Sequence, residues 1–292
     1  MPSVYSPGST NSDGERRIVL EGLAFPEAPR WHDGRLWFSD MHAHEVVVTD
    51  GDGTRETVLT VSGQPSGLGW LPDGRLLVVS MVDRRLVVFD GRSVEPYADL
   101  SPWAGFHCND MVVDTQGRAY VGNFGFDHYS GQPITPATLV RVDRDRSVHV
   151  VDESTLFPNG LAISPDGGTL ITAETYGRKL TAWEIRPDGS LSGKRTYAHL
   201  DGVFPDGICV DAEGAVWVAD IAGRQVLRVV DGGEITDVVS TGERGAYACM
   251  LGGPDRRTLF ICTADGSGPT TRQRRLGRIE AVQTTVPGAG LP

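Results

Sequence analysis

Polar residues with oxygen-bearing side chains recur at one register of a repeated phrase. The phrase reads "PNGLAISPDGGTLITAE" around Asn159 and "PDGICVDAEGAVWVAD" around Asp206, so that its second residue is an amide in one copy and a carboxylate in the other. Another copy begins "NDMVVDTQG" at Asn109, and the first copy, with Glu27 in "PEAPRWHDG", has a turn that is one residue shorter. Aligned on their turns, the six copies place these residues at the shared position: Glu27, Ser66, Asn109, Asn159, Asp206 and Ala248.

The chemistry that such a set offers is the binding of a hard divalent cation. Carboxylate and amide oxygens suit Ca²⁺, Mg²⁺ and Mn²⁺, and two carboxylates balance the charge of the ion. The set has no histidine or cysteine, which makes a zinc site less suitable. Asn and Asp before Gly are also ordinary turn residues, but recurrence in four copies favours a ligand role for Glu27, Asn109, Asn159 and Asp206. We expect one divalent ion, Ca²⁺ first, with Mg²⁺, Mn²⁺ or Zn²⁺ as alternatives.

The repeat itself predicts the elements that must position these residues. Each copy is a short apolar strand, a turn such as "PDG" or "AEG", and a second strand rich in β-branched residues. The turns are 40 to 50 residues apart, which is the length of one four-stranded propeller blade. The turns fall at these positions: Gly34, Gly74, Gly117, Gly167, Gly214 and Arg256.

Six copies predict an all-β fold, a six-bladed β-propeller of four-stranded antiparallel sheets. Its pseudo-rotational symmetry brings the shared position of every innermost strand to the mouth of the central channel, so the four polar residues should converge there. The last copy is one strand short, and we expect "RRIVLEGLAF", Arg16 to Phe25, to complete it and close the ring. We predict one domain over residues 15–285, with tails at 1–14 and 286–292.

Composition narrows the class of partner. The 292-residue chain has a formal net charge of -11, which argues against nucleic-acid and anionic-membrane partners. No segment resembles a signal peptide or a membrane span, and the four cysteines lack CxxC spacing and read as reduced thiols. We expect a cytoplasmic protein, monomeric or a small homo-oligomer, that acts on a small molecule.

At these residues the chain resembles the family of senescence marker protein, gluconolactonase and luciferin-regenerating enzyme. The matching pieces are "EAPRW" with Glu27, "NDMVVDTQGRAYVGN" with Asn109, "FPNGLAISPDG" with Asn159 and the phrase that contains Asp206. The resemblance implies a six-bladed propeller that hydrolyses a lactone. It also implies a divalent metal held by Glu27, Asn159 and Asp206, with Asn109 beside it as ligand or substrate contact.

One departure from the family bears on the substrate. Sugar-lactone members have an arginine two residues before the Asn of the "ND" motif, where it holds substrate hydroxyls, and here that place is His107. "EGP" is also replaced by "EAP" after Glu27. These changes leave the metal ligands in place and alter the side that would recognise a sugar. We therefore expect a lactone or other ester with fewer hydroxyls than gluconolactone.

The resemblance implies a metal-polarised carbonyl attacked by water, with Asp206 as the base. His107 is a second candidate base, since the usual pKa of histidine suits proton transfer near neutral pH. We expect the segment "NFGFDHYSG" to form a rim loop whose Asn123, Phe124 and Asp127 contact substrate together with His107 and Asn109. The alternatives are phosphotriester hydrolysis or a non-hydrolytic reaction on the same metal, and a binding or scaffold propeller with a structural ion.

Overall fold

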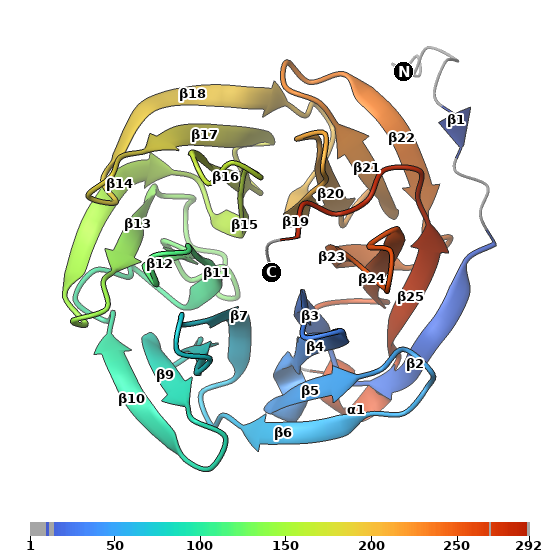
Figure 1. The fold of residues 1–292 in the computed structure, drawn as a ribbon, viewed down its shortest axis with the longest axis horizontal. Helices are drawn as coiled ribbons and strands as arrows, with labels where there is room; N and C mark the ends of the chain where they lie inside the picture. The colour runs from blue at the N-terminus through green and yellow to red at the C-terminus, as the bar shows by residue number, and fades with distance from the viewer. Residues whose placement is uncertain (1–9, 12–14, 269, 291–292) are drawn as a thin grey trace.

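The computed structural model describes residues 10–11, 15–268 and 270–290, and within them the chain is almost entirely β-structure. Six sheets are arranged like blades around a central axis (Figure 1). The described residues include only one short α-helix, α1 (Thr271–Arg274), and one 3₁₀ turn, η1 (Met41–Ala43). The predicted six-bladed β-propeller is therefore confirmed.

The first three blades each use four consecutive antiparallel strands, the first of which lies at the axis. The first blade consists of β3 (Pro26–His32), β4 (Arg35–Asp40), β5 (Glu45–Thr49) and β6 (Glu56–Thr60). The second consists of β7 (Pro65–Trp70), β8 (Leu76–Ser80), β9 (Arg85–Phe89) and β10 (Val94–Asp99). The third consists of β11 (Cys108–Val113), β12 (Ala119–Asn123), β13 (Ala137–Val142) and β14 (Val148–Thr155).

The remaining blades continue in chain order around the axis. The fourth consists of β15 (Pro158–Ile163), β16 (Thr169–Glu174), β17 (Lys179–Ile185) and β18 (Leu191–His199). The fifth consists of β19 (Pro205–Val210), β20 (Val216–Asp220), β21 (Gln225–Val229) and β22 (Ile235–Ser240). The sixth takes only three strands from this part of the chain, β23 (Gly245–Gly252), β24 (Thr258–Ala264) and β25 (Gly277–Gln283).

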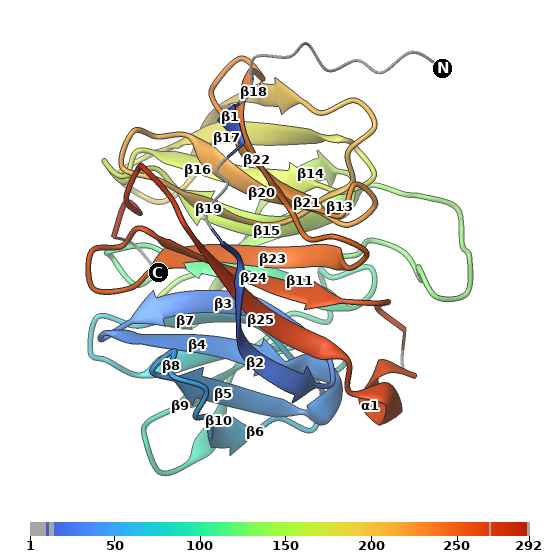
Figure 2. The same cartoon turned by 90° about the vertical axis from the view of Figure 1, so that its right-hand side faces the viewer.

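The N-terminal strand β2 (Arg17–Leu23) completes the sixth blade. It pairs antiparallel with β25, and Figure 2 shows the two strands side by side at the outer edge of that blade. This pairing joins the two ends of the domain and confirms the predicted ring closure. By pairing with β25, β2 covers the edge that β25 would otherwise offer to another chain.

Described parts of the two predicted tails contact the propeller. The short strand β1 (Thr10–Asn11) pairs parallel with β22. At the other end, Ala212 N donates to Pro287 O at 2.8 Å, and Gly288 N donates to Arg256 O at 2.8 Å. Residues 1–9, 12–14 and 291–292 of the predicted tails lie outside the described residues.

Every innermost strand contains a β-bulge close to its first residues. In β19 the pairing with β20 shifts between Pro205 and Ile208, and the innermost strands of the first four blades shift at the equivalent place. In β23 the shift lies between Ala246 and Ala248, farther from the turn. A bulge inserts an unpaired residue and re-aims the side chains beside it. The bulges therefore turn the shared polar position of the repeat toward the axis instead of into the space between blades.

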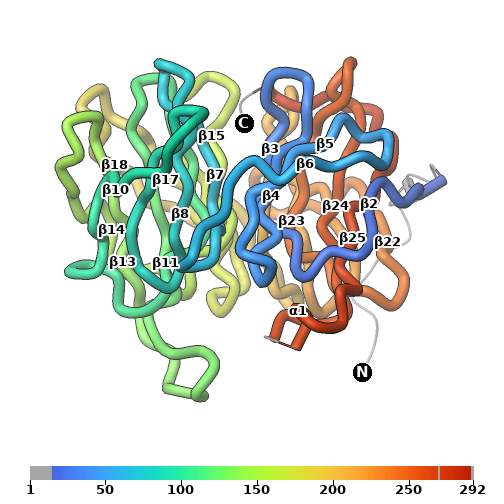
Figure 3. The backbone as a smooth tube through the Cα atoms, turned by 90° about the horizontal axis from the view of Figure 1, so that it is seen from below, coloured from blue at the N-terminus to red at the C-terminus, as the bar shows by residue number. Residues whose placement is uncertain are grey.

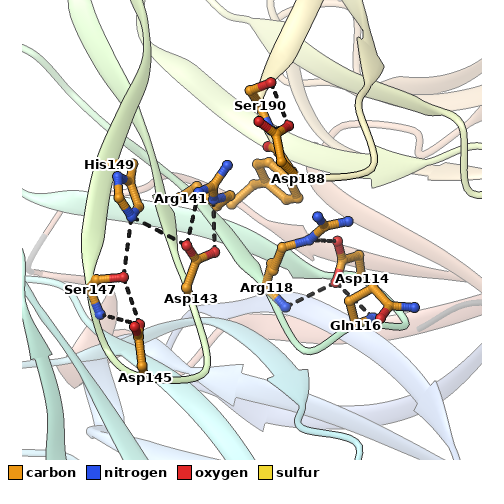
Figure 4. A network of polar contacts seen from close by, with 12 residues as sticks. Asp114, Gln116, Arg118, Arg141, Asp143, Asp145, Ser147, His149, Asp188 and Ser190 are labelled. Carbon is orange, nitrogen blue, oxygen red and sulfur yellow. Dashed lines mark hydrogen bonds and ion pairs between the residues drawn. The ribbon is translucent and has the colours of Figure 1, made fainter.

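The opposite ends of the innermost strands close with Asp-containing turns. Asp114 accepts bonds from Gln116 N and Arg118 N, both at 2.9 Å, and from Arg118 Nε at 2.6 Å (Figure 4). Arg118 Nη1 also donates to Pro187 O in the next blade at 2.9 Å. At this end of the molecule the carboxylates are thus used to hold turns and to join adjacent blades.

Packing between blades supplies the core. Fully buried Leu, Val and Ile side chains fill the space between neighbouring sheets, and tryptophans bridge them: Trp31 of β3 stacks on Phe260 of β24, with ring centroids 5.6 Å apart. The four cysteines are buried and free, as expected for reduced thiols used as apolar residues. No helix among residues 10–11, 15–268 and 270–290 is long and apolar enough to cross a membrane.

Candidate metal and substrate site

The four predicted ligand residues line one cavity at the axis of the propeller. The cavity has a volume of about 340 Å³. Glu27 comes from β3, Asn109 from β11, Asn159 from β15 and Asp206 from β19, so four blades each supply one polar side chain. Their common register in the sequence thus becomes a common place in the structure.

Burial gives the two carboxylates unusual electrostatics. Asp206 is 4% exposed, and this burial, followed by the negative charge of Asp110, raises the pKa of Asp206 well above its ordinary value. Burial, followed by the charge of Asp206, likewise raises the pKa of Glu27, although the Ala28 N–H, 3.0 Å from Glu27 Oε2, opposes the shift. The charge of Asp206 therefore makes it harder for Glu27 to ionise.

The chemistry of the donor set fits a hard cation. No ion pair between described residues includes Glu27 or Asp206, so neither carboxylate has a lysine or arginine against it. No group of three His, Cys, Asp or Glu side chains suited to a metal occurs among the described residues. The four cavity residues do not form such a group, because two of them are amides. The buried carboxylate of Asp206 and the half-buried one of Glu27, beside two amides, suit an oxygen-coordinated divalent ion and offer nothing to a thiolate or imidazole site.

The amide groups are held through their nitrogens. Asn159 Nδ2 donates to Thr175 Oγ1 at 3.2 Å, and that hydroxyl donates in turn to Pro205 O at 2.8 Å. Asn109 Nδ2 donates to Pro158 O at 3.5 Å. Because these nitrogens donate to neighbouring groups of the protein, the amide oxygens are the atoms available to a cation.

Above these polar residues the cavity wall is apolar. Phe124 and Phe157 stack with ring centroids 4.3 Å apart and an interplanar angle of 21°. The other apolar residues of the wall are these: Phe25, Met41, Met81, Phe204, Ile221 and Ala222. The cavity is thus divided into an acidic floor and an aromatic and aliphatic wall.

A polar pair lies among the lining residues contributed by loops. Tyr176, after β16, and His128, in the loop that follows β12, lie with the tyrosine hydroxyl 2.7 Å from His128 Nδ1. Figure 3 shows this long loop, residues 124–136, projecting on the same side of the propeller as α1, whereas the last described residues before position 291 lie on the opposite side. His128 is the one histidine among the residues that line the cavity.

Three residues that the sequence placed at the site are not among the lining residues. His107 stacks on Phe106 at 4.0 Å, and its burial lowers its pKa. Asn123 shapes the start of the loop: its Nδ2 donates to Thr138 O at 2.7 Å, and its Oδ1 accepts from Gly125 N at 2.9 Å. Asp127 accepts from Tyr129 N and Ser130 N inside the loop. Of the predicted loop contacts, Phe124 alone reaches the cavity.

In the sixth blade, the residue at the cavity is not the one that alignment on the turns places at the shared position. Its bulge falls between Ala246 and Ala248, and Tyr247, not Ala248, lines the cavity. Burial raises the pKa of Tyr247 to about 12, so its hydroxyl stays protonated at neutral pH. An inserted bulge residue shifts the register by one without changing the apolar pattern of the strand.

Three residues of the cavity wall could have been predicted from their position in the repeat. Phe25, Phe157 and Phe204 each stand directly before the proline that opens an innermost strand, in "FPE", "FPN" and "FPD". The phenylalanine is therefore part of the repeated phrase and stands directly before the proline with which the aligned copies begin. Its recurrence beside the polar position marks the wall in the same way that the polar residue marks the floor.

Comparison with known proteins agrees with this architecture. The sequence model described as "SMP-30/Gluconolactonase/LRE-like region" matches residues 25–265. The chain is 26% identical over 287 residues to 6-deoxy-6-sulfogluconolactonase of Pseudomonas putida, covering 94% of this chain and 96% of that protein. A solved luciferin-regenerating enzyme superposes with a TM-score of 0.82 at 20% identity, covering 94% of this chain and 97% of the other. Regucalcin from Agrobacterium tumefaciens, described as a calcium-binding protein, gives 0.81 at 19% identity over 96% and 97%.

Proposed function

Because the chain belongs to the SMP-30/gluconolactonase/LRE-like family, we propose that it is a metal-dependent hydrolase that opens a lactone poorer in hydroxyl groups than a sugar lactone. The observation that carries the proposal is the division of the cavity. Its floor has two carboxylates and two amides, and its wall is lined by Phe124, Phe157 and other apolar side chains. The floor supports hydrolysis at a polarised carbonyl, and the wall supports an apolar substrate body.

Glu27, Asn159 and Asp206 would hold the ion, with Asn109 as a further ligand or a substrate contact. Ca²⁺ is the ion that we propose first, because it accepts mixed carboxylate and amide oxygens in flexible geometry. Mg²⁺ and Mn²⁺ accept the same atoms, whereas the floor offers zinc no nitrogen or sulfur ligand. When bound, such an ion polarises the lactone carbonyl and stabilises the negative charge that develops on its oxygen.

The chain itself supplies the proton acceptor. We assign the role of general base to Asp206, a carboxylate that lines the cavity. It takes one proton from the attacking water as the new C–O bond forms. The ring C–O bond then breaks, and the departing alkoxide takes that proton back from Asp206, which gives the hydroxy acid and restores the carboxylate. His107, the second candidate base, is not among the lining residues, which weakens its claim.

The wall bears on the choice of substrate. The related protein from Pseudomonas putida is named for a sugar lactone. In this chain, however, the place of the sugar-holding arginine is occupied by His107, and the wall is largely apolar. Polyhydroxylated rings placed against such a wall would leave hydroxyls without hydrogen-bond partners, which costs affinity for each one. An alkyl- or aryl-substituted lactone would instead bury its substituent.

A substrate panel tests the proposal. Gluconolactone, alkyl γ- and δ-lactones, an aryl ester and a phosphotriester are assayed with the protein as purified, after chelation, and after Ca²⁺ is restored. We expect chelation-sensitive turnover that is highest on the alkyl lactones. Turnover that is indifferent to chelation would contradict the metal role, and faster turnover of gluconolactone would contradict the substrate class. Phosphotriester turnover alone, or loss of stability on chelation without any turnover, would favour the alternative reaction or a scaffold.

A further inference from the structure

Two polar side chains from adjacent blades meet at the cavity, away from its acidic floor. His128 comes from the loop after β12 of the third blade, and Tyr176 from the loop after β16 of the fourth. Both line the cavity, and the Tyr176 hydroxyl lies 2.7 Å from His128 Nδ1. Neither side chain makes another hydrogen bond within the part of the chain that the structure describes. The pair therefore has polar atoms left for a molecule in the cavity.

Aromatic packing fixes the two rings of this pair. His128 lies edge-on to Phe124 and Phe157, with ring centroids 6.4 Å and 5.8 Å apart and interplanar angles of 84° and 68°. Tyr176 lies edge-on to Phe157 as well, at 5.3 Å and 76°. Because Phe157 contacts both rings, the pair forms a polar edge of the aromatic wall and has a defined place in the cavity.

The loop that carries His128 also has hydrogen bonds of its own. Asp127 Oδ1 accepts from Tyr129 N and from Ser130 N, each at 3.0 Å. Asp127 N donates to Gln132 Oε1 at 3.0 Å. These bonds flank His128 in the chain and do not involve Tyr176. Removal of the tyrosine hydroxyl should therefore leave the loop conformation intact.

The hydrogen-bonding capacity left on the pair does not depend on the tautomer of the histidine. The bond between the two residues contains one proton, which belongs either to the phenol or to the imidazole. If the Tyr176 hydroxyl donates, His128 Nε2–H is the free donor and the phenol oxygen the free acceptor. If His128 Nδ1–H donates, the tyrosine O–H is the free donor and Nε2 the free acceptor. With a neutral imidazole, the pair thus presents one donor and one acceptor in both cases.

We propose that His128 and Tyr176 are specificity-determining residues that bind one hydroxyl group on the substituent of the substrate. A hydroxyl is the smallest group that both donates and accepts, so it matches the pair. An alkyl group in the same place would displace water from both free atoms without replacing its hydrogen bonds, which costs affinity. The inference rests on the proposed function, since it takes the occupant to be a lactone. It refines the substrate class to a lactone with an apolar body and one side-chain hydroxyl.

A merely structural role for the pair makes a different prediction. If the bond between His128 and Tyr176 serves only to join two loops, its loss loosens the cavity and weakens the binding of every ligand alike. A recognition role requires that its loss weakens only ligands with the hydroxyl group. The ratio of two affinities, for ligands with and without that group, therefore separates the two roles.

The experiment is calorimetric titration of the purified protein with cyclic ketones. The probes share one ring and one alkyl side chain, and they have a hydroxyl at successive side-chain carbons or, in the parent compound, none. A ketone has no ester bond to open, so its binding does not require hydrolysis. We expect the wild type to bind the best hydroxy ketone about tenfold more tightly than the parent.

Tyr176→Phe and His128→Phe keep an aromatic ring in the wall and remove the polar atoms. Each should reduce the ratio to about twofold or less by weakening the hydroxy ketone, while the affinity for the parent ketone stays equal or rises. The double variant should show no further loss, because the two residues act as one unit.

The matched control is Tyr129→Phe. Tyr129 lines the same cavity from the same loop, is 50% exposed, and its hydroxyl makes no hydrogen bond with another described residue. The chemical change equals that of Tyr176→Phe, but no neighbour orients the hydroxyl that is removed. The ratio should therefore stay at the wild-type value. A loss as large as that of Tyr176→Phe would overturn the assignment to the pair.

The other outcomes separate this inference from the proposed function. A wild-type ratio near one, or equal weakening of both ketones in Tyr176→Phe, would overturn the inference in favour of a structural role. The kcat/KM ratio of the corresponding lactones gives the same comparison if the ketones bind too weakly. Lactone turnover without preference for the hydroxyl overturns the inference alone. Hydroxyl-selective ketone binding without any lactone turnover supports the recognition pair and overturns the proposed hydrolase, and absence of both overturns both.

Discussion

Two aspartates at the ends of one strand show how differently the two faces of the propeller use buried charge. Asp211, directly after β19, is fully buried and accepts from Arg228 Nε at 2.7 Å and from Glu213 N and Ala215 N at 3.0 and 3.1 Å. Asp206, near the start of the same strand, is almost as deeply buried but has no ion pair with another described residue. A carboxylate buried without a cation costs stability. We interpret its presence at the cavity end as a sign that a ligand completes it.

Exposed turns reinforce the contrast. The Ser164 hydroxyl and the Gly168 N–H lower the pKa of Asp166, in the turn after β15, whereas burial raises that of Asp206. At the turn end, aspartates are stabilised in the charged form by groups of their own turn. At the cavity end the same residue type is destabilised in that form. The comparison teaches that the repeat assigns one residue type two physical roles, according to which end of the strand it occupies.

The largest effect is expected when the cavity carboxylate is neutralised. Asp206→Asn keeps the size of the side chain, so the fold should survive, but it removes one of the two carboxylates of the floor and the proposed base. Turnover on the best substrate should fall by about 10²–10⁴-fold. Steady-state kinetics with circular dichroism as a check of folding measures this, and retention of the wild-type rate would remove Asp206 from the mechanism.

Neutralising the turn-end carboxylate should damage stability instead. Asp211→Asn removes the buried ionic partner of Arg228 and leaves that arginine with the exposed Glu213, and breaking a buried pair costs about 3–5 kcal/mol in free energy of unfolding. Urea denaturation measures the loss, while kcat per folded molecule should be unchanged. A variant that is as stable as wild type but inactive would reverse the roles that we assign to the two ends of β19.

A change in pH should alter the free energy of unfolding in opposite directions through the carboxylates at the cavity end and through those at the turn end. Because burial raises the folded-state pKa of Glu27 and Asp206, the folded metal-free protein binds protons more readily there than the unfolded chain. Their unfavourable contribution is therefore absent below the ordinary values of 4.5 and 3.8 and grows as pH rises toward the raised values. The slope is at most about 1.4 kcal/mol per pH unit for each proton.

The matched control for this pH dependence is Glu27→Gln. Unfolding free energies of the metal-free wild type and variant are measured by urea between acid and neutral pH. The difference between them should widen in favour of the variant as pH rises, whatever the other carboxylates of the chain contribute. A constant difference across the range would show that Glu27 is not destabilised by its surroundings.

The smallest effect is expected at the exposed turn. Asp166→Asn makes the same chemical change as Asp206→Asn, but asparagine also accepts hydrogen bonds and suits turns. Its free energy of unfolding should change by about 0.5 kcal/mol or less, and its activity and metal affinity should be unchanged. Damage equal to that of Asp206→Asn would mean that the turn and not the cavity is the functional end of the repeat.

The repeat made the fold and the floor predictable from sequence. Turn spacing gives the number of blades, and blade symmetry brings Glu27 and Asp206 together although they are far apart in the chain. The missing strand of the last blade identified residues 16–25 as the closing segment. All of these follow from periodicity, which a single sequence displays directly.

Periodicity does not predict whether a side chain outside the repeat points into the cavity. Asn123 and Asp127 were chosen for residue type and proximity to the strand end, but their hydrogen bonds with Thr138, Gly125 and their own loop turn them to structural use. Tyr247 was missed because a bulge adds one residue without a mark in the apolar pattern. Loop conformation and bulge position both depend on backbone contacts between segments that no local pattern records.

The central claim is that the floor is built for a bound cation at the expense of the metal-free protein. It is tested most directly by four unfolding curves, two for each of two proteins. Wild type and Asp206→Asn are melted without metal and with saturating Ca²⁺. We predict that the order of stability reverses: the variant is the more stable without metal, and the wild type is the more stable with Ca²⁺, gaining about 2.7 kcal/mol at a concentration one hundred times its Kd. A variant that is the less stable under both conditions, with Ca²⁺ shifting neither curve, would contradict the claim.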